Sequence, residues 1–157
     1  MKAASVHELK KELGTLDHSR LLEICLRLAK YKKDNKELMT YMIFESEDED
    51  QYIESVKSEM QEMMDSMNRH SIFYMKKTMR KAIRNMDKFI RYSALKETEA
   101  ELRISFCEMV KEINIPLHRS RVMNNMYDRQ LKKIDTALTK LHEDLQYDYQ
   151  GRIDEIS

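Results

Sequence analysis

Residues 72–92 read IFYMKKTMRKAIRNMDKFIRY. Apolar side chains recur in this stretch at steps of three and four residues, at Ile72, Met75, Met79, Ala82, Met86 and Phe89. This spacing places them on one face of an α-helix.

The stretch before it, over about 51–68, has the same rhythm at Ile53, Val56, Met60, Met63 and Met67. The rhythm breaks near 68–71, where its continuation would bury His70. The two stretches therefore predict antiparallel helices joined by a tight turn. A single long helix with a stutter is the alternative.

The composition extends this prediction to the whole chain. Glycine occurs 2 times and proline once in 157 residues, whereas average usage would give about nineteen of the two together. Sheets need many turns, and turns need these residues. We therefore expect an all-α fold: a multi-helix bundle of six or seven helices, two or three of them long and antiparallel, in a single domain over 1–157.

Capping patterns predict short helices over about 5–45. Ser5-Val-His-Glu8 and the stretch from Asp34 to Glu37 have the form of capping boxes, in which two side chains satisfy free backbone donors. Asp17 is the expected N-cap of the helix between them. The third helix, to about residue 45, is apolar nearly all round, so we expect it to be buried between other helices.

Long helices are expected over about 51–149. Thr98-Glu-Ala-Glu101 predicts another capping box, and Pro116 ends the helix that it opens. The last helix is expected to run from about 120 to 149 and to span about 45 Å. A helix that long exceeds what a domain of this mass needs, so we expect part of it to contact a partner, with a homodimer as one option.

The chain lacks the common signatures of catalysis. The five histidines are scattered, and glycines stand only at positions 14 and 151, which leaves no phosphate-binding loop. Cys25 and Cys107 lie among apolar neighbours and are expected to be buried thiols. We expect no catalytic residue, no metal site and no cofactor, and hence a protein that is not an enzyme.

Methionine occurs 13 times, and three interpretations apply to the cluster over 60–67. Core packing explains it best, because these methionines continue the seam of Ile53 and Val56. A pliable groove for partner helices and a thioether site for Cu(I) are the alternatives.

Charge is unevenly distributed although the net charge is zero. From Glu45 to Asp65 there are nine acids and one base, and from Ser71 to Tyr92 seven bases and one acid. Six bases fall within an arc of about 100° opposite the apolar seam. They are the candidate binding residues, within a basic helical stripe over 76–91: Lys77, Arg80, Lys81, Arg84, Lys88 and Arg91.

Three interpretations of the stripe remain open. The acidic helix partly neutralises it, for instance through Glu59 and Lys76; it binds nucleic acid or another polyanion; or it binds an acidic protein surface. Glu62 and Asp65 point away from their own seam, which argues against complete neutralisation.

Two resemblances accompany these patterns. Ser5 to Leu16 followed by Arg20-Leu-Leu22 resembles a compressed SAP motif, a small DNA-binding module, with a shorter connection and without the second glycine. The stretches 21–44 and 89–99 resemble an uncharacterised family of small bacterial all-helical proteins, which implies an all-helical fold and no particular activity.

No membrane segment is expected, because the longest nearly apolar run covers only 38–44 and a bilayer requires about 20 residues. The N-terminus also lacks a signal-peptide pattern, so a cytoplasmic protein is expected. The leading hypothesis is a non-enzymatic helical protein–protein interaction or scaffold module with an unknown partner. The alternative is binding of nucleic acid or another polyanion along the stripe.

Overall fold

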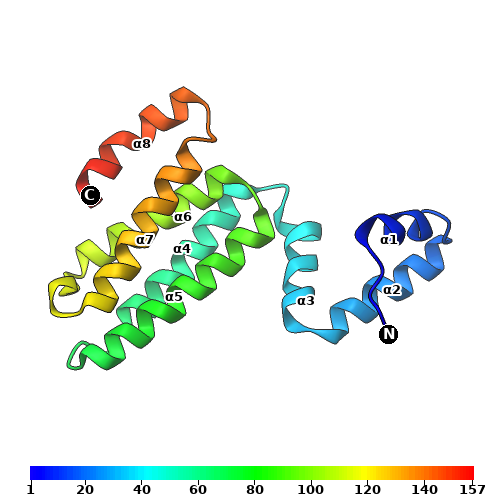
Figure 1. The fold of residues 1–157 in the computed structure, drawn as a ribbon, viewed down its shortest axis with the longest axis horizontal. Helices are drawn as coiled ribbons and strands as arrows, with labels where there is room; N and C mark the ends of the chain where they lie inside the picture. Colours follow the sequence, from blue (N-terminus) through cyan, green and yellow to red (C-terminus); the bar gives the residue numbers. More distant parts are fainter. The chain divides into compact units, whose positions relative to one another are not determined.

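The computed structural model describes residues 1–157 (Figure 1). It contains eight α-helices and no β-strand, which confirms the all-α class but exceeds the six or seven helices expected. The chain divides into two compact units, Met1–Phe44 and Glu45–Ser157. Their boundary lies at the start of the acidic connection between the short and the long helices. The single domain over 1–157 stays a prediction.

Three short helices form the N-terminal unit: α1 (Val6–Leu13), α2 (His18–Tyr31) and α3 (Lys33–Thr40), followed by a π-helical turn (Tyr41–Glu45). The capping box of α1 is confirmed, since Ser5 Oγ accepts from the Glu8 backbone and the Glu8 carboxylate accepts from the Ser5 backbone. Asp17 caps α2 as predicted.

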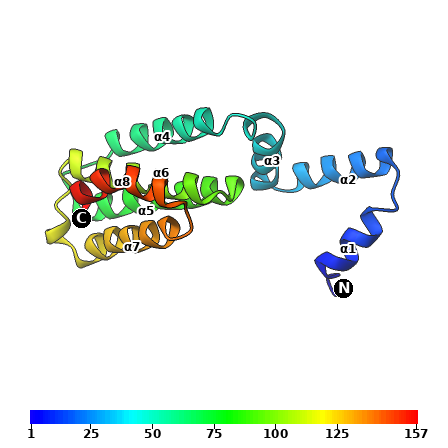
Figure 2. The same ribbon diagram turned by 90° about the horizontal axis from the view of Figure 1, so that it is seen from above.

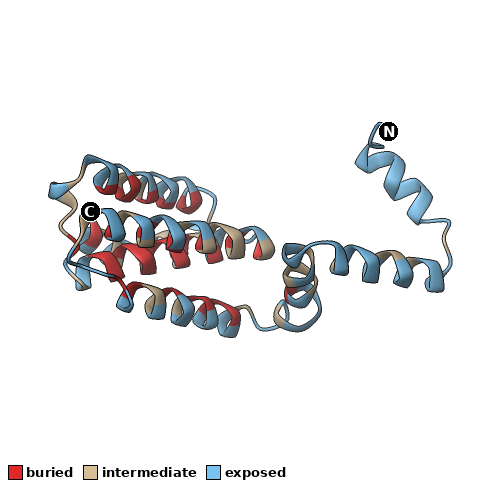
Figure 3. Cartoon of the chain, turned by 90° about the horizontal axis from the view of Figure 1, so that it is seen from below, coloured by how far each residue is buried: buried red, intermediate tan, exposed pale blue.

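The N-terminal unit has almost no core. No residue of α1, α2 or α3 is buried (Figure 3), because about forty residues in short helices enclose little volume. Met42, Ile43 and Phe44 are exposed, so the prediction that this segment lies buried between helices is wrong. Cys25 is also exposed, which corrects the expectation of a buried thiol there.

Five longer helices form the C-terminal unit: α4 (Glu49–Asp65), α5 (Ile72–Ser93), α6 (Lys96–Glu112), α7 (Arg121–Leu138) and α8 (Glu143–Ile156). A 3₁₀ turn (Leu117–Arg119) precedes α7. α4 and α5 are separate antiparallel helices joined by a short turn, so the predicted turn is confirmed and the stutter is excluded (Figures 1 and 2).

The core of this unit surrounds α6, which packs against α4, α5, α7 and α8. Residues 102–107 are all buried, the polar Arg103 and Ser105 included (Figure 3). On α4 the buried seam uses Met64 in place of the predicted Met63. For α6 the sequence predicts a single apolar face, but α6 is the central helix of the bundle.

Two predicted helix starts are wrong. α3 begins at Lys33, before Asp34, and has no side-chain cap. α6 begins at Lys96, so Thr98 lies inside the helix, where its hydroxyl donates to the Glu49 carboxylate. Burial between helices gives Thr98 a tertiary partner, and this contact replaces the local cap.

The single helix expected over about 120–149 is also wrong. α7 ends at Leu138, and α8 begins at Glu143 and lies against α6. Ile156 is thereby buried, and Arg152 forms ion pairs with α6. A straight helix would lose these contacts. The overlong helix on which the expected homodimer rested is therefore absent. No helix in the chain combines the length and the apolar character needed to cross a bilayer.

Candidate anion-binding face

The candidate site lies on the outward side of α5, opposite its buried seam. Met75, Met79, Ala82 and Met86 point into the bundle, which directs the bases of the helix toward solvent. From Lys77 to Arg91 the row covers about 21 Å at 1.5 Å per residue. We call it the basic face, and its members are Lys77, Arg80, Lys81, Arg84, Lys88 and Arg91. All are exposed except Lys88, which is half-buried.

Five bases of this face have no carboxylate partner. No ion pair involves Lys77, Arg80, Lys81, Arg84 or Arg91, although the ion pairs elsewhere in the unit engage Lys57, Lys96, Arg103, Lys133 and Arg152. A surface cation without a partner keeps its full charge available to a ligand. We call these five the free cations of the basic face.

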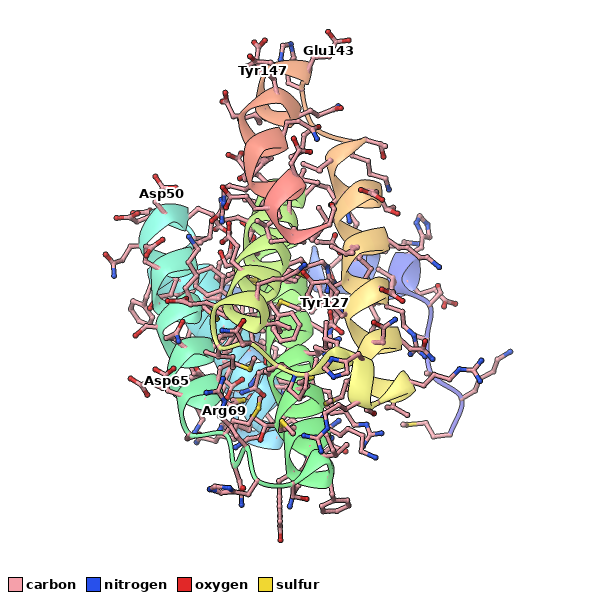
Figure 4. All side chains as sticks on the ribbon, turned by 90° about the vertical axis from the view of Figure 1, so that its left-hand side faces the viewer. Asp50, Asp65, Arg69, Tyr127, Glu143 and Tyr147 are labelled. Carbon is pink, nitrogen blue, oxygen red and sulfur yellow. The ribbon has the colours of Figure 1, made fainter.

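The acidic helix α4 does not cover them. Glu59, which the sequence placed against Lys76, accepts a hydrogen bond from Asn85 Nδ2 at 3.1 Å instead. Asp50 and Asp65 point outward near the two ends of α4 (Figure 4). The acidic side chains of α4 therefore form no ion pair with the free cations.

A groove of about 530 Å³ separates the basic face from α7. We call it the α5–α7 groove. Its lining from α5 is Lys77, Arg80, Ile83, Arg84 and Asp87, and its lining from α7 is Val122, Asn125, Met126, Arg129, Gln130 and Lys133. Five bases and one acid line it, so the groove is strongly electropositive.

Asp87, the one acid that lines the groove, forms ion pairs with Arg103 of α6 and Lys133 of α7. The buried Arg103 of α6 places Nη2 at 2.8 Å from Asp87 Oδ1, and Lys133 Nζ lies 3.4 Å from the same oxygen. Arg103 Nη1 also donates to Gln130 Oε1 at 2.7 Å. One guanidinium thus ties α5 and α7 to the central helix, and the negative charge of Asp87 is compensated.

Sequence reasoning missed the second wall of this groove. Arg129 and Lys133 stand one turn apart on α7, a spacing visible in the sequence. No pattern in the sequence predicts that this side of α7 lies opposite the basic face. That placement follows from the packing of both helices on α6.

A second polar cluster joins α8 and α4 to α6. Glu101 pairs with Arg152 Nη1 and with Lys57 Nζ, both at 2.7 Å. Burial raises the pKa of Glu101, but the hydrogen bonds and charges of Arg152 and Lys57 outweigh it and lower the pKa from 4.5 to about 2. Arg152, Lys57 and Glu101 all have partners of opposite charge, so the cluster ties the three helices together.

In residues 1–157, no group of three histidine, cysteine or acidic side chains is placed to hold a metal ion. The comparisons add no relative: no protein-family model, no curated protein and no solved structure matches the chain. The SAP-like and bacterial resemblances of the sequence stay predictions.

Proposed function

We propose that this protein is a binding module for a polyanion, with the phosphate backbone of nucleic acid as the ligand class, and that the basic face is its contact surface. The observation that carries the proposal is the row of five cations without ion-pair partners: Lys77, Arg80, Lys81, Arg84 and Arg91.

The spacing of the bases favours a polymer over a compact anion. They recur about once per helical turn, roughly every 5 Å, so one small anion reaches only two of them. A chain with a regularly repeated negative charge reaches all, and each phosphate contact releases a condensed counterion. The acids of α4 lower this attraction at moderate ionic strength, since screening extends over about 10 Å. Binding is therefore expected to be weak in high salt and without base specificity.

The test measures binding of fluorescent random-sequence DNA at low salt by anisotropy. Wild type is compared with Arg80→Glu/Arg84→Glu and with a matched control, Lys10→Glu/Lys11→Glu, which makes the same charge change in α1. We expect the α5 variant to lose binding by about two orders of magnitude and the control to keep it. No binding by wild type, or equal loss in both variants, would contradict the proposal.

A second function, the protein-interaction or scaffold module favoured by the sequence, is supported by the N-terminal unit. Leu9, Leu22 and Leu28 are about half exposed, at 49%, 51% and 53%. Amphipathic helices with an uncovered apolar face commonly bind a helix of another chain. One form of this protein-interaction function is self-association through the exposed leucines.

Light scattering at high concentration tests the self-associating form. A dimer that Leu9→Asp/Leu22→Asp converts to a monomer supports it, whereas a wild-type monomer excludes it. Polyanion binding through α5 is measured separately and does not depend on this result.

A further inference from the structure

We infer that the nucleic acid bound is a single strand, and that it lies in the α5–α7 groove with Arg129 of α7 as its phosphate contact on the second wall. This inference rests on the proposed function and specifies its ligand and its site. Arg129 does not belong to the basic face that the sequence indicates.

The first argument is that cations line both sides of the groove. Lys77, Arg80 and Arg84 stand on the α5 side, and Arg129 and Lys133 on the α7 side. Three of the five are arginines, whose planar guanidinium donates hydrogen bonds to two phosphate oxygens at once. A strand inside the groove therefore meets positive charge on both flanks, whereas a ligand on the outer surface of α5 meets only one row.

The second argument is size. At about 530 Å³ the groove has the volume of a small-ligand site, and its walls are two helices packed on the same central helix. A duplex is a rigid cylinder and presents its phosphates only to the rims, whereas the backbone of an unpaired strand is flexible enough to lie between the two cationic rows. One unpaired strand enters the groove.

The third argument is the chemistry of the floor. Ile83, Val122 and Met126 supply apolar surface between the cationic walls, which suits the sugar and base faces of a strand whose phosphates contact the rims. No aromatic side chain lines the groove, so base stacking of the usual kind is absent. Binding is therefore expected to tolerate any base sequence.

The fourth argument is that the groove is already formed. Arg103 bonds to Asp87 of α5 and to Gln130 of α7, which fixes both walls before a ligand arrives. A preformed site loses less conformational entropy on binding.

The test uses the full chain and three probes: a random-sequence single-stranded oligonucleotide, its duplex, and poly-glutamate. Arg129→Glu is compared with Lys132→Glu, a matched charge reversal at an exposed residue of α7 that does not line the groove. We expect wild type to bind the single strand severalfold more tightly than the duplex, because only the strand reaches the cations of both walls. Arg129→Glu should weaken single-strand binding about tenfold at low salt, Arg129→Gln by less, and Lys132→Glu hardly at all.

The outcomes separate the two proposals. If Arg80→Glu/Arg84→Glu abolishes binding while Arg129→Glu and Lys132→Glu behave alike, or if the duplex binds as tightly as the single strand, the groove inference is overturned and polyanion binding stands. If wild type binds neither oligonucleotide, both proposals fail. Binding of poly-glutamate alone would also overturn both, because it would show that the basic face binds carboxylates and not a phosphate backbone.

Discussion

Arg103 of α6 lies 2.8 Å from the carboxylate of Asp87 on α5 and is itself only 3% exposed. The same guanidinium bonds to Glu99 on its own helix and to Gln130 on α7. A buried charge with several partners is costly to leave half-paired. This residue therefore couples the stability of the bundle to the shape of the α5–α7 groove.

Replacing Arg103 with methionine should destabilise the C-terminal unit by about 3 kcal/mol, because Asp87 and Gln130 lose their partner in a mostly buried place. Arg84→Met, at an exposed position of the basic face, should change stability by less than about 0.5 kcal/mol. Urea denaturation followed by circular dichroism measures both. An unchanged midpoint for Arg103→Met would show that the network does not stabilise the fold.

Stability should fall in acid through Glu101. Its pKa is lowered from 4.5 to about 2 in the folded chain, so its contribution is present above pH 4.5 and is lost as the pH falls toward 2. The shift corresponds to at most about 3 kcal/mol. Glu101→Gln should be less stable than wild type at pH 7, and the difference should shrink at pH 3. A difference that stays constant with pH would contradict the assignment.

Tyr127→Phe should cost about 1 kcal/mol, because its buried hydroxyl donates to the Ile156 carbonyl at 2.6 Å and holds the end of α8. Tyr147, on α8 itself, is 82% exposed and provides the control (Figure 4). Tyr147→Phe should leave stability unchanged. Hydrogen exchange of the α8 amides should accelerate in the Tyr127 variant alone, and equal protection in both variants would contradict this contact.

The two cysteines should differ sharply in reactivity. Cys25 is exposed, whereas burial raises the pKa of the Cys107 thiol to about 12, and only a thiolate attacks an alkylating reagent. Iodoacetamide should modify the native protein once, at Cys25, and the urea-unfolded protein twice. Rapid native labelling of Cys107 by mass spectrometry would show that α6 is not enclosed.

Much of the fold follows from local patterns. The seam that contains Met75 and Met79 predicts both the α5 helix and the outward direction of its bases, because the two faces of one helix are fixed relative to each other. The Ser5 cap is equally local, since both of its bonds lie within four residues. Such features need no knowledge of the rest of the chain.

The errors arise where tertiary contacts decide. The turn between α7 and α8 contains neither glycine nor proline, and Leu141 and Leu145 continue the helical rhythm through it. The chain turns there because Ile156 and Arg152 find partners around α6. The sequence does not indicate Arg129 for the same reason. Its position opposite the basic face depends on how α5 and α7 pack on α6.

The salt dependence of single-strand binding tests the central claim most directly. If Lys77, Arg80, Arg84 and Arg129 of the groove contact the phosphates of a single strand, a plot of log affinity against log salt concentration should have a slope of about −3, and Arg80→Glu/Arg84→Glu should reduce its magnitude by at least about 1.4. A wild-type slope near zero, or the same slope in wild type and variant, would contradict the binding of a phosphate backbone along α5.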